Sequence, residues 1–98
     1  MPLALRLRAG HLLPLARMNP EKVAELIRAG LPGAQVLVQS PDNTHYSARI
    51  VAQAFAGKRG IARHQLVYAT LGELVGREVH ALSIEAFTPD EWAARTNG

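Results

Sequence analysis

Apolar side chains recur along this chain at two different spacings, and the order of those spacings limits the folds that it can adopt. Intervals of three and four residues are typical of an amphipathic helix, whereas alternate residues are typical of a strand with one buried face. The expected order is helix 20–30, strands 35–39 and 45–52, helix 64–75, strand 80–87 and a short helix from Pro89. This order, α-β-β-α-β-α, predicts an α+β domain whose three-stranded sheet is covered by helices on one face.

Helix-capping and turn residues support these boundaries. Asn19-Pro20-Glu21 has the composition of a helix start, and Thr88-Pro89-Asp90-Glu91 has the spacing of a capping box. A cluster of glycine and proline at 30–33 is expected to end the first helix, and Gly76 to end the second. Turn-forming residues at 40–43 separate the first two strands, which predicts a hairpin.

Size and composition predict one packed domain after a basic leader. Hydrophobic residues make up 48% of the 98 residues, which is enough for a core in a domain of ordinary size. Residues 1–17 hold three of the eleven basic side chains and none of the eight acidic ones, so residues 18–98 have eight of each and no net charge. We expect the domain at 18–95 and a disordered tail at 96–98.

Three interpretations of the leader remain open. It could be a targeting presequence, since it is rich in arginine and lacks acids, or a flexible leader, or a non-native extension before Met18. It is too short and too charged to span a membrane. We expect the protein in the cytoplasm, or in an organelle if the leader is a presequence.

The chain contains no cysteine, which restricts its chemistry. Disulfides, thiolate nucleophiles, zinc ribbons and a self-contained iron–sulfur site all need thiols. The sequence also lacks a phosphate-binding glycine loop and a nucleophile elbow. Its adjacent carboxylates, Asp90 and Glu91, are explained by the start of the last helix. We therefore expect a non-enzymatic protein.

Histidine is the main candidate ligand that remains. His64 follows Arg63 near the expected start of the second helix, where the positive helix end favours the neutral imidazole that binds metals. The alternative is that His64 only flanks the apolar stripe of that helix. His45 is expected near the surface at the start of the second strand, and His80 is expected to be partly buried. His11 lies in the leader.

A second candidate site is basic. Gly57-Lys58-Arg59-Gly60 has the Gly-x-x-Gly spacing with which KH domains clamp a nucleic-acid backbone, and Arg63 follows it. Main-chain amides together with Lys58, Arg59 and Arg63 could hold phosphate groups. The alternative is an ordinary solvated loop, and the neutral charge of residues 18–98 argues against strong binding.

Four motifs in this order resemble the BolA family, from Asn19 to Trp92. They are Phe55-Ala56-Gly57-Lys58, Arg63-His64-Gln65-Leu66-Val67-Tyr68, His80-Ala81-Leu82-Ser83-Ile84 and Thr88-Pro89-Asp90-Glu91-Trp92. Gln65 and the short turn between the first two strands are more similar to the IbaG-type branch than to BolA itself. BolA-like proteins have a fold similar to class II KH domains. The resemblance thus implies the order α-β-β-α-α-β-α, with a helical turn at 60–63 before the main helix.

The resemblance also implies a partner protein. BolA-like proteins pair with monothiol glutaredoxins around a shared [2Fe–2S] cluster, and the histidine of their Arg-His motif, here His64, is a ligand. Such a cluster needs about four ligands, usually thiolates, which the glutaredoxin cysteine and glutathione would supply. A second ligand is expected from the loop between the first two strands, where His45 is the candidate and Asp42 the alternative.

Two other functions remain as alternatives. BolA itself is described as a transcriptional regulator, so the resemblance allows DNA binding through Lys58, Arg59 and Arg63. The domain could also be a protein-interaction module without a metal. Under the leading interpretation the isolated chain binds no cofactor and is a monomer, and it forms a heterodimer with its glutaredoxin partner.

Overall fold

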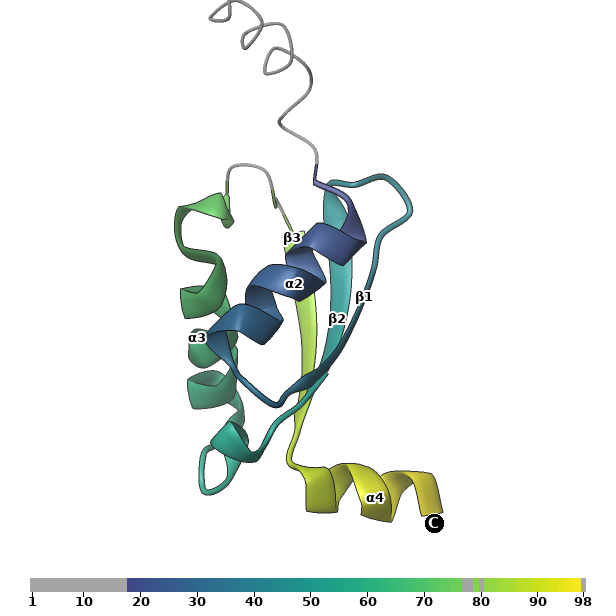
Figure 1. Cartoon of the computed structure of the whole chain (residues 1–98), viewed down its shortest axis with the longest axis vertical. Coiled ribbons are helices and arrows are strands. Elements are labelled where there is room, and N and C mark those ends of the chain that lie inside the picture. The colour runs from purple at the N-terminus through teal and green to yellow at the C-terminus, as the bar shows by residue number, and fades with distance from the viewer. Residues whose placement is uncertain (1–17, 77–78, 80, 98) are drawn as a thin grey trace, which may run out of the picture.

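The structure is a computed structural model that describes residues 18–76, 79 and 81–97, and its elements are labelled in Figure 1. The helices are α2 (Pro20–Gly30), α3 (Gly60–Leu71) and α4 (Pro89–Asn97), and the strands are β1 (Gln35–Gln39), β2 (His45–Val51) and β3 (Ala81–Phe87). Two short 3-10 turns, η1 (Gln53–Phe55) and η2 (Gly72–Leu74), flank α3. In the described ranges, no helix has the length and apolar character needed to cross a membrane.

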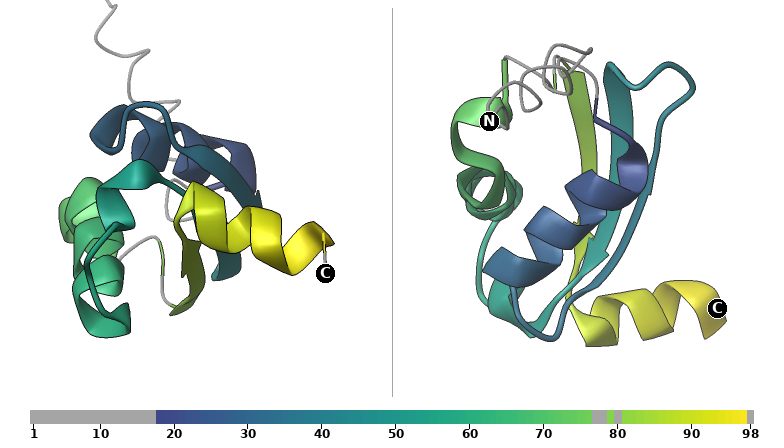
Figure 2. Two further views of the ribbon diagram at one scale, coloured as in Figure 1. Left: turned by 90° about the horizontal axis from the view of Figure 1, so that it is seen from below. Right: turned by 45° about the horizontal axis from the view of Figure 1, so that its top comes forward.

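The three strands form one mixed sheet in the order β1-β2-β3. β1 and β2 form the predicted antiparallel hairpin, whereas β3 runs parallel to β2. Parallel pairing requires the chain to return from the Val51 end of β2 to its His45 end, and α3 makes this crossing. Helices α2 and α3 cover one face of the sheet, and α4 lies at its Val51 end (Figures 1 and 2). The predicted α+β fold is confirmed.

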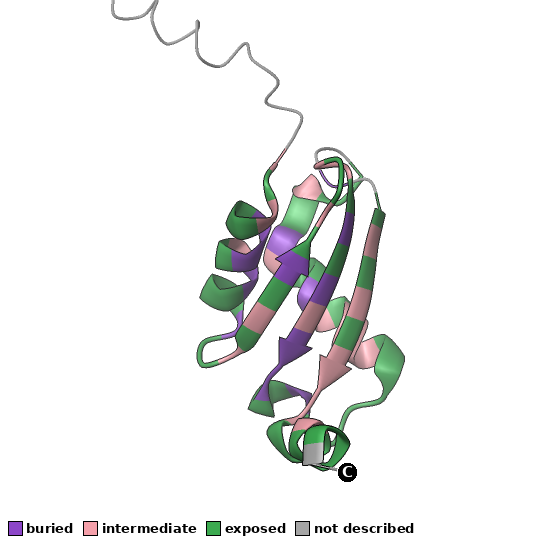
Figure 3. Ribbon diagram, turned by 90° about the vertical axis from the view of Figure 1, so that its right-hand side faces the viewer, coloured by how far each residue is buried: buried purple, intermediate pink, exposed green. Residues whose placement is uncertain are grey.

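The sheet buries the face that the alternating residues predict. The side chains that point toward α2 and α3 are Val36, Val38, Tyr46, Ala48, Ile50, Leu82, Ile84 and Ala86. Val23 and Ile27 of α2 and Val67 of α3 pack against them and are fully buried. Phe55 of η1, with 0% of its surface exposed, closes the core at the Val51 end. Figure 3 shows the buried residues along the central strand.

Both predicted helix starts are confirmed. The Asn19 side-chain oxygen accepts a hydrogen bond of 2.9 Å from the Lys22 backbone N–H at the start of α2. At the start of α4, the Glu91 N–H donates to the Thr88 hydroxyl oxygen over 3.1 Å, and the Thr88 N–H donates to the Glu91 carboxylate over 3.0 Å. These reciprocal bonds form the predicted capping box.

Three helix boundaries differ from the expected ones. Gly72 has a φ of 57°, so α3 ends there and not at Gly76. Residues 60–63 form the first turn of α3 itself, and the short helical turn that precedes α3 is η1. Helix α4 runs to Asn97, into the segment that we expected to be a disordered tail.

Candidate functional site

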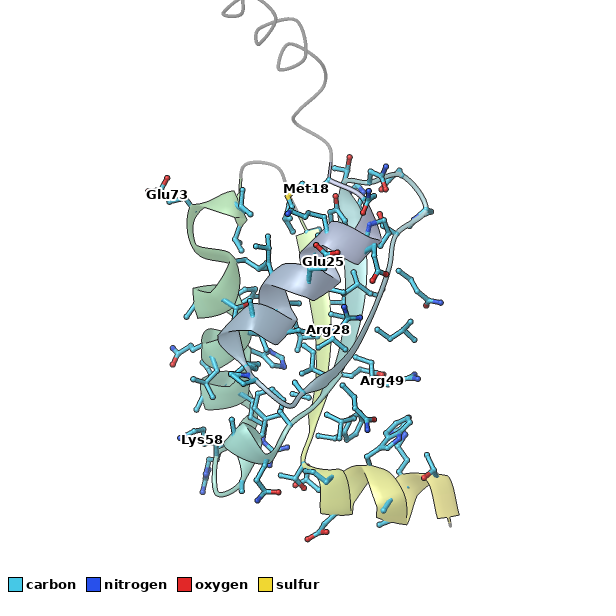
Figure 4. The ribbon with its side chains drawn as sticks, viewed as in Figure 1. Met18, Glu25, Arg28, Arg49, Lys58 and Glu73 are labelled. Atoms are coloured by element: carbon cyan, nitrogen blue, oxygen red, sulfur yellow. The ribbon has the colours of Figure 1, made fainter. Side chains whose placement is uncertain are left out.

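The loop between η1 and α3 carries the predicted basic residues. Gly57 has a φ of 79°, a backbone conformation that suits glycine, and it turns the chain from η1 toward α3. Lys58 and Arg59 are exposed, and the Arg59 side chain makes no capping bond to α3 although Arg59 is its N-cap residue. Figure 4 shows Lys58 at the opposite end of the domain from Met18. The Gly-x-x-Gly segment therefore presents two exposed cations between η1 and α3.

His64 lies in the second turn of α3, on the same stripe as the buried Val67 and Leu71. Its side chain is half-buried, and it forms no hydrogen bond or ion pair with any residue that the structure describes. Among the residues that the structure describes, the ring is therefore neither sealed in the core nor held through both nitrogens. An imidazole in this state can still offer a nitrogen to an external metal.

Arg63, the residue before His64, links α3 to β3 and α4 through its side chain. Its guanidinium forms a bidentate salt bridge with the Glu91 carboxylate, with N–O distances of 2.6 and 3.0 Å. It also donates to the carbonyl oxygens of Lys58 and Ala86, over 2.8 and 3.1 Å, and only 13% of its side chain is exposed. The hydrogen bonds that Arg63 donates to the Glu91 carboxylate are the main reason that the pKa of Glu91 falls to about 2.

The hydrogen bonds of Arg63 differ from what the sequence led us to expect of this residue. We expected Arg63 to be a candidate phosphate ligand together with Lys58 and Arg59. In the structure its donors are already used by Glu91 and by two backbone carbonyls, and its side chain is nearly buried. Of the three predicted residues, Lys58 and Arg59 remain available for a nucleic acid. Arg63 instead holds α4 and β3 against α3.

His45 and Asp42 form a pair of their own at the β1–β2 turn. The His45 ring Nδ1 lies 2.9 Å from an Asp42 carboxylate oxygen, and both side chains are exposed. The other Asp42 oxygen accepts the backbone N–H groups of His45 and Thr44. The bond from the His45 N–H is the largest of several effects that hold the pKa of Asp42 well below its usual range.

The structure does not bring His45 and His64 together. Arg63, next to His64, reaches the carbonyl of Ala86, which lies opposite Ile50 near the end of β2. His45 is the first residue of that strand, and the five steps along the strand from His45 to Ile50 span about 16 Å. Metal–nitrogen bonds are only about 2 Å long, so one metal centre cannot bind both imidazoles in this conformation. The expectation that His45 supplies a second ligand beside His64 therefore stays a prediction, and it requires the β1–β2 turn to move from this conformation.

The other predicted residues contribute no second metal site in the described part of the chain. Asp42, the alternative to His45, lies at the same distant turn. His11 and His80 lie outside the described residues. Among the described residues, no group of three or more His, Cys, Asp or Glu side chains could hold a metal ion. Ligation by His64 stays a prediction, and the ring is the one among the described histidines that lies in the Arg-His motif.

Sequence reasoning missed the second role of Glu91 and the position of Trp92. The capping box explained Glu91 completely, and no local pattern links it to Arg63, which lies 28 residues earlier. The Trp92 side chain extends from α4 and contacts the Phe87 ring, with 5.3 Å between the ring centroids. The Arg49 guanidinium lies 5.0 Å from the centre of the Trp92 ring. The approach of Trp92 to the open face of the sheet depends on how α4 turns after β3.

Comparison with known proteins identifies the family. The sequence model described as BolA-like protein matches residues 29–91, which is more than half of the chain. The chain belongs to the BolA family. A protein of Acinetobacter guillouiae, described as an uncharacterized protein in the rpoN-murA intergenic region, is 42% identical over 76 residues, covering 76% of this chain and 90% of that protein.

Two further BolA-family proteins are similar to this chain, one in its solved structure and one in its sequence. The structure of a BolA protein homologue from Coxiella burnetii has a TM-score of 0.71 and 32% identity, and it covers 78% of this chain and 97% of that one. The DNA-binding transcriptional regulator BolA of Vibrio cholerae is 41% identical over 49 residues, which is 50% of this chain but only 46% of the Vibrio protein. Family members are thus named as regulators or BolA-like proteins rather than as enzymes.

Proposed function

We propose that this BolA-family protein is a non-enzymatic adaptor that binds a monothiol glutaredoxin and supplies His64 to a shared [2Fe–2S] cluster. The observation that carries the proposal is the half-buried His64 ring, which no described residue engages. It lies in the Arg-His motif that the family resemblance assigns to the cluster. The role of the protein would be iron–sulfur trafficking or iron sensing.

The metal ligands that this chain can offer fit a cluster shared with a partner and not a cluster that the chain holds alone. A [2Fe–2S] cluster needs about four ligands, mostly thiolates, and histidine can replace some of them. This chain has no cysteine, so the thiolates would come from the glutaredoxin and from glutathione. Because His45 lies at the other end of β2, His64 is the ligand that this chain contributes in the described conformation.

The proposal predicts a response that depends on His64 alone. Adding the wild-type chain to a cluster-loaded monothiol glutaredoxin is expected to change the visible absorption and circular dichroism of the cluster, since a histidine nitrogen replaces another ligand. His64→Ala should abolish this change, whereas the matched control His45→Ala should leave it intact. Far-UV circular dichroism checks that both variants fold.

Two outcomes would contradict the adaptor proposal. The first is a cluster spectrum that does not change when the wild-type chain is added. The second is an equal change with His64→Ala, which would assign ligation to another residue. A loss of the change with His45→Ala would instead show that the β1–β2 turn moves toward the cluster on binding.

DNA binding is a second candidate, and a specific observation favours it. The Gly-x-x-Gly segment lies between η1 and α3 with Lys58 and Arg59 exposed, as a backbone clamp requires. The BolA relative of Vibrio cholerae is named a DNA-binding transcriptional regulator. Against it, residues 18–98 carry no net charge, so affinity would have to come from this local pair.

The nucleic-acid candidate predicts a change in salt dependence. In the full chain, Lys58→Ala with Arg59→Ala should lower the affinity for duplex DNA and reduce the slope of log K against log salt by about one unit per lost phosphate contact. Lys22→Ala, which removes an exposed cation from α2, is the matched control and should change neither quantity. Equal salt slopes for the wild type and the double variant would exclude this loop as the DNA contact.

A further inference from the structure

The edge strand β1 has a symmetric sequence. Gln35-Val36-Leu37-Val38-Gln39 reads the same in both directions, and β1 lies at one side of the sheet (Figure 3). Natural edge strands commonly carry charges, prolines or bulges that prevent pairing with another chain. β1 has no charged residue or proline, and its register with β2 is continuous.

The backbone groups that face the open edge belong to Val36 and Val38. The Ala52 N–H donates to the Phe87 carbonyl over 2.9 Å, so the even-numbered residues of β2 bond to β3 and the odd-numbered ones to β1. The odd-numbered residues of β1 lie opposite those of β2. Because bonding alternates along an antiparallel pair, the two valines face outward. Arg28 Nη2, which donates to the Val36 carbonyl over 3.2 Å, approaches from that side.

We propose that β1 pairs with β1 of a second copy of this chain, antiparallel and centred on Leu37. In this register Val36 of each copy lies opposite Val38 of the other. The outward N–H of each valine then meets the outward carbonyl of its partner. Leu37 faces Leu37 across a two-fold axis, in a non-hydrogen-bonded position where opposed side chains lie closest.

Side chains and charges are compatible with this pairing. Leu37 is 49% exposed and would be covered by its counterpart, and the amide of Gln35 would meet that of Gln39. No like charges oppose each other within the strands. The second copy competes with Arg28 for the Val36 carbonyl, but Arg28 Nη1 also lies 3.5 Å from the Glu21 carboxylate, so a displaced guanidinium keeps an ionic partner at the same edge.

The proposed interface is small, which sets the concentration at which it forms. Five residues a side bury less surface than a standard protein–protein interface, and contacts of that size are weak or transient. The chain is therefore a monomer when dilute, as we expect for the isolated protein, and pairs when it is concentrated. The pairing involves neither His64 nor the loop at Lys58.

Substitutions that place a positive or a negative charge at position 37 test the pairing. Sedimentation equilibrium of the full chain between about 10 µM and about 1 mM should show an apparent mass that rises toward twice the monomer mass. Leu37→Lys and Leu37→Glu should each remain monomeric, because like charges directly opposite each other are destabilising. An equimolar mixture of the two variants should associate again, since opposite charges then face each other.

Controls and amide exchange make the test specific. Ile61→Lys changes another exposed apolar residue, 72% exposed on α3, and should associate like the wild type. Hydrogen exchange at the amides of Val36 and Val38 should slow as concentration rises. The proposal is overturned if the wild type stays monomeric throughout, if Leu37→Lys associates as the wild type does, or if the mixed variants do not associate.

Discussion

Phe55→Ala is expected to lower the free energy of unfolding by about 3–5 kcal/mol. Phe55 has no exposed surface and closes the core where β2, η1 and α3 meet. Removing its ring leaves a cavity that the surrounding backbone can fill only in part. Because small domains are stable by about 5–15 kcal/mol, this single change should remove a large share of the stability of the fold.

Urea denaturation followed by far-UV circular dichroism measures the effect of Phe55→Ala. Tyr68→Ala is the matched aromatic control, because Tyr68 lies on α3 with 38% of its surface exposed, and its cost should be about 1 kcal/mol or less. A similar midpoint for the two variants would contradict the position of Phe55 in the core.

Arg63→Met is expected to lower the free energy of unfolding by about 2 kcal/mol. The change keeps an apolar stem but removes the bridge to Glu91 and the bonds to the carbonyls of Lys58 and Ala86. The value is reduced for solvent screening because 47% of the Glu91 side chain is exposed. Loss of the bridge should also loosen α4, since Glu91 lies in its first turn.

Two readouts separate the Arg63 effect from a general loss of stability. Trp92 lies next to Glu91, so its fluorescence should shift to the red in folded Arg63→Met as α4 becomes more exposed to water. Lys22→Met is the matched control, because among the described residues the Lys22 side chain forms only an exposed ion pair, with Glu25 over 3.9 Å, and such pairs contribute little. Unchanged stability and fluorescence in Arg63→Met would mean that the bridge does not hold α4.

The Arg63–Glu91 bridge also predicts a dependence on pH. The pKa of Glu91 falls from an ordinary value near 4.5 to about 2 in the folded chain. A carboxyl with a lowered folded pKa stabilises the fold above its unfolded pKa and loses this effect as the pH falls through its folded pKa. The stability difference between the wild type and Glu91→Gln should therefore be full at pH 6 and shrink between about pH 5 and pH 2. A difference that stays constant over this range would show that Glu91 is not charged in the bridge.

Local patterns predicted the parts of the fold that depend on neighbouring residues. The Asn19 cap, the Thr88–Glu91 capping box and the alternating residues of β2 each act over a few residues, and all were confirmed. The end of α3 was missed because Leu74 and Val75 continue the apolar spacing beyond it. Gly72 overrides that spacing with a positive φ, which spacing alone cannot indicate.

The sequence could select candidate site residues but could not indicate how they are arranged. His64 was selected by its motif, and Lys58 and Arg59 by their glycine-flanked loop. The bond between Arg63 and Glu91 joins residues 28 positions apart, so no local signal could have revealed it. The separation of His45 from His64 follows from the parallel pairing of β3 with β2, which places the β1–β2 turn and the start of α3 at opposite ends of the sheet.

Nitrogen coupling to the reduced cluster tests the central claim most directly. The chain is labelled with ¹⁵N-histidine, mixed with unlabelled cluster-loaded glutaredoxin and reduced, and pulsed electron paramagnetic resonance then records any coupling from a bound imidazole. The proposal predicts ¹⁵N coupling with the wild type and with His45→Ala, and its loss with His64→Ala. Coupling that persists in folded His64→Ala, or that is absent with the wild type, would contradict ligation by His64.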